Sequence, residues 1–576
     1  MKLDCSTPKP QQAGNALLLT IVMTGVALTT LAGVMAWSAS SYKQADRYGQ
    51  YTRSVAAAEA ATENVLSQIS GDFQAGGESL VVANLRKYRK SALTSTNSSY
   101  WADWEFSDAQ GHVDGTYVQP AGASSYVVLN STYAGLKGFV STYTLISNAR
   151  QTSVPQDVTG GVFQQIQLAR IPIFQFAMYT SGDMEVSCGQ PFTIDGRVHS
   201  NGQMYVEPAA DLTFQSDVTA VGSVLNERHP LDNRLPKVPV GIVVYTKSQQ
   251  PVSHVPALTL PIGTTNTPTA IREIIQPPLP NEDHNSPIGR QRYYNLADVV
   301  VVVNNTTVTA SSGDFNGFAT VIPTNEVRLF VSTNASFYDA RESKTVQSVD
   351  INVGALAAWS GTNTNVRTVL GVRDVSSVYV LDRRTQSATK LNAVRAINGS
   401  QLPTSGLSSG LTIATARPLY VLGNYNTNNP LPASLVGDAI TILSRNWSDT
   451  NSTAGVASRV ALPTTVNAAI LAGAVETTLG VYGGGMENFP RFLETWGPAN
   501  AFTYNGSMVK MFPSLYATNA WGNNNNIYSP PARVWAYDTR FDDGTKLPPL
   551  TPGLVKVIRG QWASLQANQT NPPARF

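Results

Sequence analysis

His199 and Asp195 are the two side chains of this sequence best suited to acid–base chemistry. They lie four residues apart in IDGRVHSNG, where glycines flank the turn. A histidine and a carboxylate can move protons, and carboxylate pairs cleave glycosidic bonds. No second histidine or paired acidic motif accompanies them, and a corner histidine bonded to backbone is the more common outcome. We therefore expect no catalytic site here, and an extracytoplasmic carbohydrate-active enzyme is the least favoured function.

Three other segments match part of a reactive or metal-binding motif in residue type but lack the rest of the motif or the secondary structure that it needs. Residues 406–410 read GLSSG, but a nucleophile elbow needs a strand before its serine and a helix after it, and here a loop precedes and a strand follows. Residues 542–544 (DDG) and 314–317 (DFNG) offer oxygen ligands without completing a calcium loop. P-loop, Rossmann, HExxH and paired CxxC motifs are absent from the sequence. We expect a non-enzymatic protein with no cofactor and no metal.

Composition favours a β-rich protein outside the cytoplasm. Only 14% of the 576 residues are charged and 42% are hydrophobic, against about 25% charged in an average soluble domain. Asn, Ser, Thr and Gly replace the missing charge, which is typical of strand-and-turn surfaces. A net charge of +2 provides no basic field, so nucleic acid is not an expected partner. The two cysteines, Cys5 and Cys188, exclude a disulfide framework.

The strongest signal is an uncharged stretch from Asn15 to Trp37. About 23 helical residues at 1.5 Å each span a bilayer core of about 30 Å. Apolar side chains recur along it, namely Leu17, Leu18, Leu19, Ile21, Val22, Leu28, Leu31 and Trp37. The proline-free, alanine-rich stretch Ser40–Ile69 repeats apolar residues at helical spacing. We expect one helix across residues 15–70, with its first part in a membrane.

The residues before and after this stretch resemble those of type IV pilins and type II secretion pseudopilins. A short polar leader, KPQQAG, ends at Gly14 and is followed by NALLLTIV. AAAEAA at residues 56–61 resembles the stretch after the anchor in PilX-like minor pilins. The resemblance implies that a prepilin peptidase cuts between Gly14 and Asn15. It also implies an inner-membrane precursor that joins other pilin-like subunits in a periplasmic or cell-surface filament.

Two departures from the major pilins favour a minor subunit. Major pilins begin with phenylalanine and place glutamate fifth, whereas here these positions hold Asn15 and Leu19. A carboxylate in lipid needs a partner, so a subunit that lacks this glutamate does not form that pair. The alternative is an uncleaved signal anchor that tethers a surface adhesin for glycan or protein.

The predicted fold class is α+β, mainly β, with a long N-terminal transmembrane helix and a β-rich body containing solenoid-like segments. After a leader at 1–14, we expect a pilin-like α+β region at 71–180. A β-solenoid-like body follows at 181–480, with insertions at about 226–295 and 336–400. Short strands punctuated by glycine suggest the solenoid, although their irregular interval leaves a β-sandwich open.

Aromatic residues concentrate in the region 481–576. The sequence predicts either a binding surface for glycan or a partner subunit, or core packing under long loops. The candidates are Trp496, Tyr504, Trp521, Tyr528 and Trp535.

Overall fold

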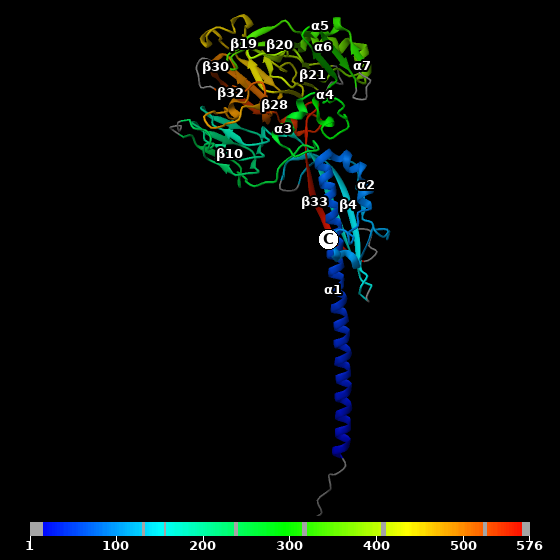
Figure 1. Ribbon diagram of the computed structural model, residues 1–576. Coiled ribbons are helices and arrows are strands. Elements are labelled where there is room, and N and C mark those ends of the chain that lie inside the picture. Colours follow the sequence, from blue (N-terminus) through cyan, green and yellow to red (C-terminus); the bar gives the residue numbers. More distant parts are fainter. Residues whose placement is uncertain are drawn as a thin grey trace, which may run out of the picture.

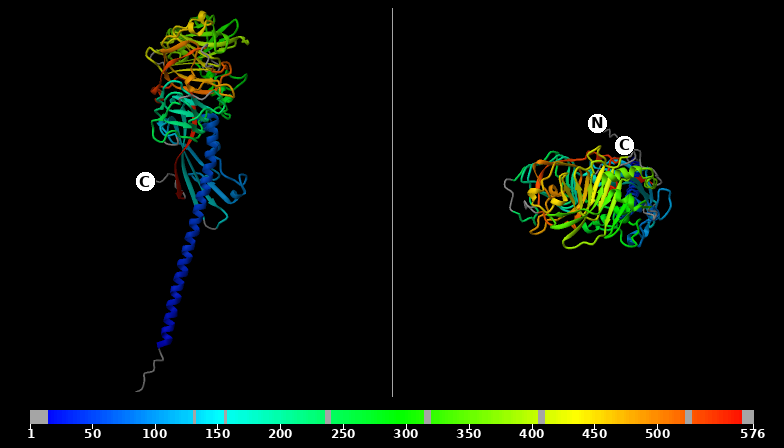
Figure 2. Two further views of the ribbon diagram at one scale, coloured as in Figure 1. Left: turned by 90° about the vertical axis from the view of Figure 1, so that its left-hand side faces the viewer. Right: turned by 90° about the horizontal axis from the view of Figure 1, so that it is seen from above.

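The computed structural model describes residues 15–129, 133–154, 157–234, 240–313, 320–404, 410–521 and 527–566. A long helix projects from a small head, and a larger β body lies at the opposite end of the head (Figure 1). Seen from above, the body is elongated (Figure 2). The predicted fold class, a long N-terminal apolar helix followed by a β-rich body, is confirmed.

The helix α1 runs from Asn15 to Ala83 without a proline. Its helical backbone is interrupted near the end at Gly77, where φ is 68°, a conformation that glycine adopts at little cost. The short helix α2, Leu85–Arg89, follows and packs back on the head. The helix is therefore longer than the predicted 15–70, because its last turns pack against the head sheet.

The head is a six-stranded antiparallel sheet with α1 against one face. Its strand order is β1-β4-β5-β33, with β2 and β3 paired to β4. The strands are β1 Trp104–Ser107, β2 Tyr117–Pro120, β3 Ser125–Val128, β4 Lys137–Gln151, β5 Thr159–Pro172 and β33 Gly553–Gln566. Val65, Ile69 and Phe73 of α1 lie in one buried cluster with Tyr143 and Ile166 of the sheet.

The last strand that the structure describes, β33, belongs to the head sheet. β33 pairs with β5 along most of its length, and in Figure 1 it runs back from the body into the head. Residues 173–552 therefore leave the head after β5 and return before β33. The structure places residues 553–566 of the predicted C-terminal region in the head.

The body begins with a stack of coils that repeat every 20 residues. Met184 pairs with Met204 and Met204 with Val224, all parallel. The strands of the stack are β6 Met178–Thr180, β7 Met184–Val186, β8 Phe192–Ile194, β9 Val198–Ser200, β10 Met204–Val206, β11 Leu212–Phe214, β12 Val218–Ala220, β13 Val224–Leu225 and β14 Val243–Tyr245. They form three faces, β13-β10-β7, β14-β11-β8 and β12-β9-β6.

Larger, mostly parallel sheets continue from this stack, since β6 also pairs with β31. One sheet of eleven strands runs from β12 to β17, and one of seven strands lies beside it. The eleven-stranded sheet adds β15 Val299–Val303, β16 Val308–Ser312, β17 Thr320–Ile322, β21 Ser377–Asp382, β23 Leu411–Thr415, β25 Ala433–Gly437, β28 Ala469–Ala474 and β31 Met508–Pro513. The seven-stranded sheet holds β18 Val331–Ser332, β19 Ser336–Asp339, β20 Lys344–Asn352, β22 Lys390–Ile397, β24 Leu419–Leu422, β26 Ile440–Leu443 and β29 Arg491–Phe492. A sheet of three parallel strands comprises β27 Thr464–Asn467, β30 Thr495–Gly506 and β32 Ser529–Tyr537.

Short helices connect these strands. They are α3 Pro268–Arg272, α4 Tyr293–Leu296, α5 Thr324–Phe330, α6 Val353–Thr362 and α7 Thr364–Val369, with 3-10 turns η1 Ser99–Asp103, η2 Ile173–Gln175, η3 Glu273–Ile275, η4 Gly289–Gln291, η5 Asp449–Asn451, η6 Val456–Ser458, η7 Met486–Asn488 and η8 Thr539–Asp542. The two predicted insertions lie within the body. Residues 226–295 bury apolar side chains in its main core, and residues 336–400 supply strands of both large sheets.

Candidate functional site

The N-terminal part of α1 makes no packing contact that buries its side chains. Every side chain from Asn15 to Ser40 is exposed, and the eight predicted membrane-helix residues are between 54% and 74% exposed. Among the described residues, α1 is the one helix long and apolar enough to cross a membrane, judged by length and composition. A helix that is apolar all round is normally covered by lipid or by other protein. Both Figures 1 and 2 show this segment projecting away from the head.

The threonine side chains of this segment are satisfied within the helix. Thr20, Thr24, Thr29 and Thr30 each donate a hydrogen bond from Oγ1 to the carbonyl oxygen four residues earlier, at 2.6 to 2.9 Å. In hydrocarbon an unsatisfied hydroxyl costs free energy, so this bonding makes the threonines compatible with lipid. Between Ala16 and Trp37 the helix thus presents an apolar surface on which the threonine hydroxyls need no water.

The head begins where α1 comes into direct contact with the start of β5. Ser54 Oγ donates to the carbonyl oxygen of Val158 at 3.0 Å. A Cβ atom on Gly160 would lie 2.7 Å from the backbone nitrogen of Val55. Glycine at this position therefore allows the helix backbone to pack directly on the strand. Farther along, Ala57, Ala58 and Ala61 are buried against the sheet.

The opposite side of α1 remains exposed along the head. We call this set the open face: Thr52, Arg53, Ala56, Glu59, Ser67, Gly71 and Gln74. Its side chains are small or polar, and it continues the exposed apolar segment on the same helix. It is the surface that a second helix could reach without moving the head. The sequence alone does not mark this face, although the residues at 52, 56, 59, 67, 71 and 74 follow helical spacing.

Gly14 and the rest of the predicted leader lie outside the described residues. Asn15 is the first residue of α1 and is exposed. The predicted cleavage between Gly14 and Asn15 therefore remains a prediction.

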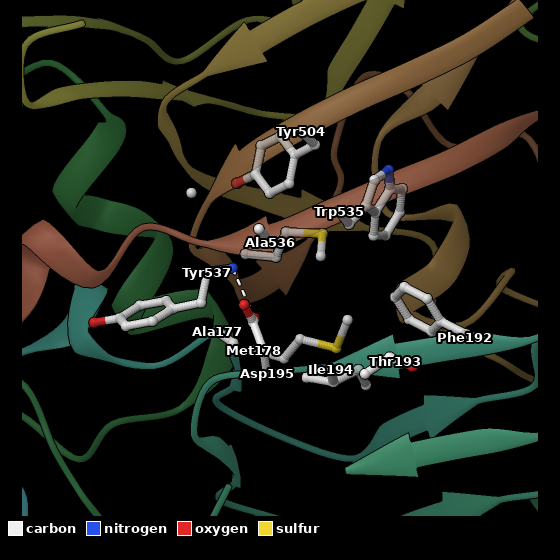
Figure 3. A pocket seen from close by; sticks show the side chains of 12 residues that line it. Ala177, Met178, Phe192, Thr193, Ile194, Asp195, Tyr504, Trp535, Ala536 and Tyr537 are labelled. Carbon is white, nitrogen blue, oxygen red and sulfur yellow. Dashed lines mark hydrogen bonds between the residues drawn. The ribbon is translucent and has the colours of Figure 1, made fainter. Parts of the chain in front are cut away.

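His199 and Asp195 take part in separate interactions. His199 is 0% exposed, and its Nε2 and Nδ1 lie 2.9 Å from Asn201 Oδ1 and 2.8 Å from Thr219 Oγ1. Burial lowers the pKa of His199 to about 4. Asp195 Oδ1 instead accepts the backbone N–H of Tyr537 at 2.8 Å (Figure 3). This arrangement ties both side chains to the fold rather than aiming them at a common space.

The candidate calcium residues in the described chain are turn residues. Asp543 Oδ1 accepts hydrogen bonds from the backbone N–H and hydroxyl of Thr545, and Asp542 Oδ1 accepts from the Tyr537 hydroxyl at 3.1 Å. Within the described ranges, no group of three or more His, Cys, Asp or Glu side chains lies close enough to hold a metal ion. Residues 314–317 and 406–409 lie outside the described chain.

The aromatic residues near the C-terminus mostly pack in the core. Trp496 and Tyr504 are each 1% exposed and Tyr528 is 8% exposed, so of the two alternatives these three rings take core packing rather than a binding surface. Trp496 and Tyr504 both lie on β30 and face inward, where Trp496 packs edge-on against Phe492. Trp521 and Trp535 remain half-buried.

A narrow slot beside Trp535 is lined by rings and methionines (Figure 3). Trp535 lies with Tyr504 above Met178, and Phe192 meets the indole edge-on at 5.4 Å. Its internal space of about 20 Å³ is near that of a single water molecule. The slot is a packing seam between β8 and β32 with no room for a larger ligand.

Comparison with known proteins does not assign this chain to a family. No family model matches the sequence, and no curated protein matches it. Among solved structures, it is similar to the crystal structure of the competence-associated pilin ComZ from Thermus thermophilus. The sequence identity is 10%, the TM-score is 0.30, and the match covers 86% of this chain and 97% of that chain. A TM-score of 0.30 does not establish a shared fold.

Proposed function

We propose that this chain is a non-enzymatic, membrane-anchored, pilin-like subunit that assembles with other such subunits through α1. One observation carries the proposal: α1, helical without interruption from Asn15 to Gly76, is apolar and exposed in its first part and packs against the head sheet in its second part. The head sheet holds that second part in place, and the β body is displayed beyond it.

The exposed segment suits two environments in turn. Its apolar side chains fit lipid, and Gly25 and Gly33 have no atom within 4 Å of an added Cβ, so their surface is open. Small residues on an apolar helix permit close approach of a second helix. A precursor could therefore leave the bilayer for a helical bundle with little change in what surrounds it.

The proposed order of events begins with the removal of the leader. A prepilin peptidase would remove residues 1–14 on the inner face of the inner membrane, and the body would lie on the extracytoplasmic side. Asn15 and Leu19 replace the first and fifth residues of major pilins, which favours a minor, PilX-like subunit of a type IV pilus or type II secretion-like filament.

Site-specific photo-crosslinking tests the assembly surface. A benzophenone amino acid at Ala56, on the open face, should form adducts with other pilin-like subunits in intact cells. The same group at Leu479, which is 80% exposed on the body, is the matched control and should form none of these adducts. Equal adducts from both positions, or none from Ala56, would contradict assembly through α1.

A further inference from the structure

A cavity of about 240 Å³ lies between the head and the first coils of the body. The head contributes the loop before β4, and the body contributes the corner formed by β9 and β12. An engineered apolar cavity of about 150 Å³ is large enough to hold benzene. This cavity therefore has room for one six-membered ring with substituents.

One side of the cavity is apolar, and the side chains that form it are almost fully buried. Tyr133 and Leu136 from the head are 5% and 4% exposed, and Phe176 and Val198 from the body are 2% and 1% exposed. Two of these four side chains, Tyr133 and Phe176, are aromatic, and aromatic rings provide apolar area against which a sugar ring can pack.

The other side carries charge at its rim. Arg197 donates from Nε to Asp217 Oδ2 at 3.2 Å, and Lys247 Nζ lies 3.0 Å from both Asp217 oxygens. Arg197 and Asp217 line the cavity, and Lys247 lies behind Asp217 and shares its negative charge with Arg197. Across the described ranges, Nε is the one Arg197 atom that donates to a protein acceptor, so its Nη1 and Nη2 hydrogens can reach a ligand.

Gln250 adds a second donor at the rim. Its Oε1 accepts the backbone N–H of Val218 at 2.8 Å, which fixes the orientation of the amide. In the part of the chain that the structure describes, its Nε2 donates to no protein acceptor. The amide therefore offers two hydrogens beside Arg197.

The hydroxyl oxygen of Thr219 supplies a hydrogen-bond acceptor, because the protonation of the His199 ring decides where the Thr219 hydroxyl donates. Asn201 Oδ1 accepts the backbone N–H of Leu258 while its Nδ2 donates to the Leu258 carbonyl, so Asn201 Oδ1 must also accept from His199 Nε2. The neutral ring then carries its proton on Nε2, and Nδ1 accepts the Thr219 hydroxyl at 2.8 Å. With its proton engaged, the Thr219 oxygen that lines the cavity is left as an acceptor.

We propose that this cavity binds a single six-membered sugar ring that carries a carboxylate, the unit of an acidic glycan. The ring stacks on the aromatic wall, the carboxylate meets Arg197 and Gln250, and a ring hydroxyl donates to Thr219. Arginine forms paired hydrogen bonds to carboxylates, which favours this class over a neutral sugar. The inference gives the body a binding role separate from assembly through α1.

Saturation-transfer NMR on the full chain in detergent micelles tests the proposal, with sodium glucuronate and glucose as probes. Saturation should pass to the glucuronate ring protons, with a Kd on the order of millimolar, and glucuronate should bind about tenfold more tightly than glucose. No transfer at tens of millimolar, or equal affinity for the two sugars, would overturn the proposal.

Gln250→Glu is the discriminating variant. Glutamate can keep the bond to the Val218 N–H while an anionic oxygen replaces the free amide donor, so glucuronate affinity should fall by about tenfold or more. Glu207→Gln is the matched control, because it breaks the ion pair with Arg228, which is 2.6 Å away in the same coil stack, and should bind as the parent does. Undiminished binding in Gln250→Glu, with the parent's unfolding temperature, would refute the site. Neither result depends on whether α1 assembles.

Discussion

Pro172, the last residue of β5, lies directly opposite Gly553, the first residue of β33, in an antiparallel pair. The whole body, residues 173–552, is thus inserted between two neighbouring strands of the head sheet. Paired residues in an antiparallel sheet have Cα atoms about 5 Å apart. The body therefore enters and leaves the head through two adjacent points.

The head should fold without the body. Because Pro172 and Gly553 are adjacent, a two-residue turn such as Asn-Gly in place of residues 173–552 can join β5 to β33. We expect a purified variant of this kind to show a protease-resistant core and a cooperative unfolding transition by circular dichroism. The same chain cut before Gly553 is its control and should be degraded, because it lacks the buried Leu554, Val555 and Leu565. Equal resistance of the two chains would contradict the account.

Gly160 should be essential to the docking of α1 on β5. In Gly160→Ala the new Cβ would meet the helix backbone 2.7 Å away at Val55, and overpacking of this kind costs about 1 to 3 kcal/mol. The midpoint temperature for thermal unfolding of the head should therefore be lower in this variant than in the parent. Gly71→Ala, on the exposed side of the same helix with nothing within 4 Å, should instead leave stability unchanged or raise it by up to about 1 kcal/mol.

The sequence predicted the long helix because its pattern is local. The uncharged run after Asn15 follows from one segment alone. The return of β33 to the head could not be predicted, because it depends on pairing across the entire body. The 20-residue coil repeat is visible in Gly182, Gly202 and Gly222, but Gly189 and Gly196 between them conceal the interval.

The stability of the body should depend on pH through His199. Burial lowers the pKa of His199 to about 4, below the ordinary value of about 6.5, so protons bind preferentially to the unfolded chain in this window. This contribution is present above pH 6.5 and is lost as the pH falls toward 4, by about 3 kcal/mol in all.

Unfolding midpoints at pH 7 and pH 4.5 test this dependence. The parent should lose more stability between the two values than His199→Gln, whose amide can bond to the same Asn201 and Thr219 partners without titrating. Carboxylates titrate alike in both proteins and cancel in the comparison. The same pH dependence in both would show that His199 does not contribute.

A charge in the apolar segment should weaken membrane retention. Leu28→Lys places an ammonium group near the middle of the uncharged run, at a cost of about 3 kcal/mol. We expect a smaller share of the protein in carbonate-washed membranes than for Tyr48→Lys, which adds the same charge to an exposed part of α1 beyond that run. Equal retention of the two variants would count against the apolar segment as the anchor.

From the sequence, the candidate site could be predicted only for residues that lie in one continuous segment, the apolar first part of α1. The apolar residues from Leu17 to Trp37 are exposed as an anchor requires. The open face could not be separated from the buried face by composition, since Ala56 is exposed and Ala58 is 0% exposed in one alanine run. For Trp496 and Tyr504 the sequence leaves a surface and the core both open, because local sequence does not show which side of a parallel strand faces the core.

The central claim is that α1 is the processed anchor and assembly helix of a pilin-like subunit. N-terminal sequencing and intact mass of the chain, purified from membranes of its own cells with and without prepilin peptidase, test it most directly. We predict a mature chain that begins at Asn15 in cells with the enzyme and a chain that keeps residues 1–14 in cells without it. A chain that keeps its leader in both would contradict the claim and leave a signal-anchored surface protein.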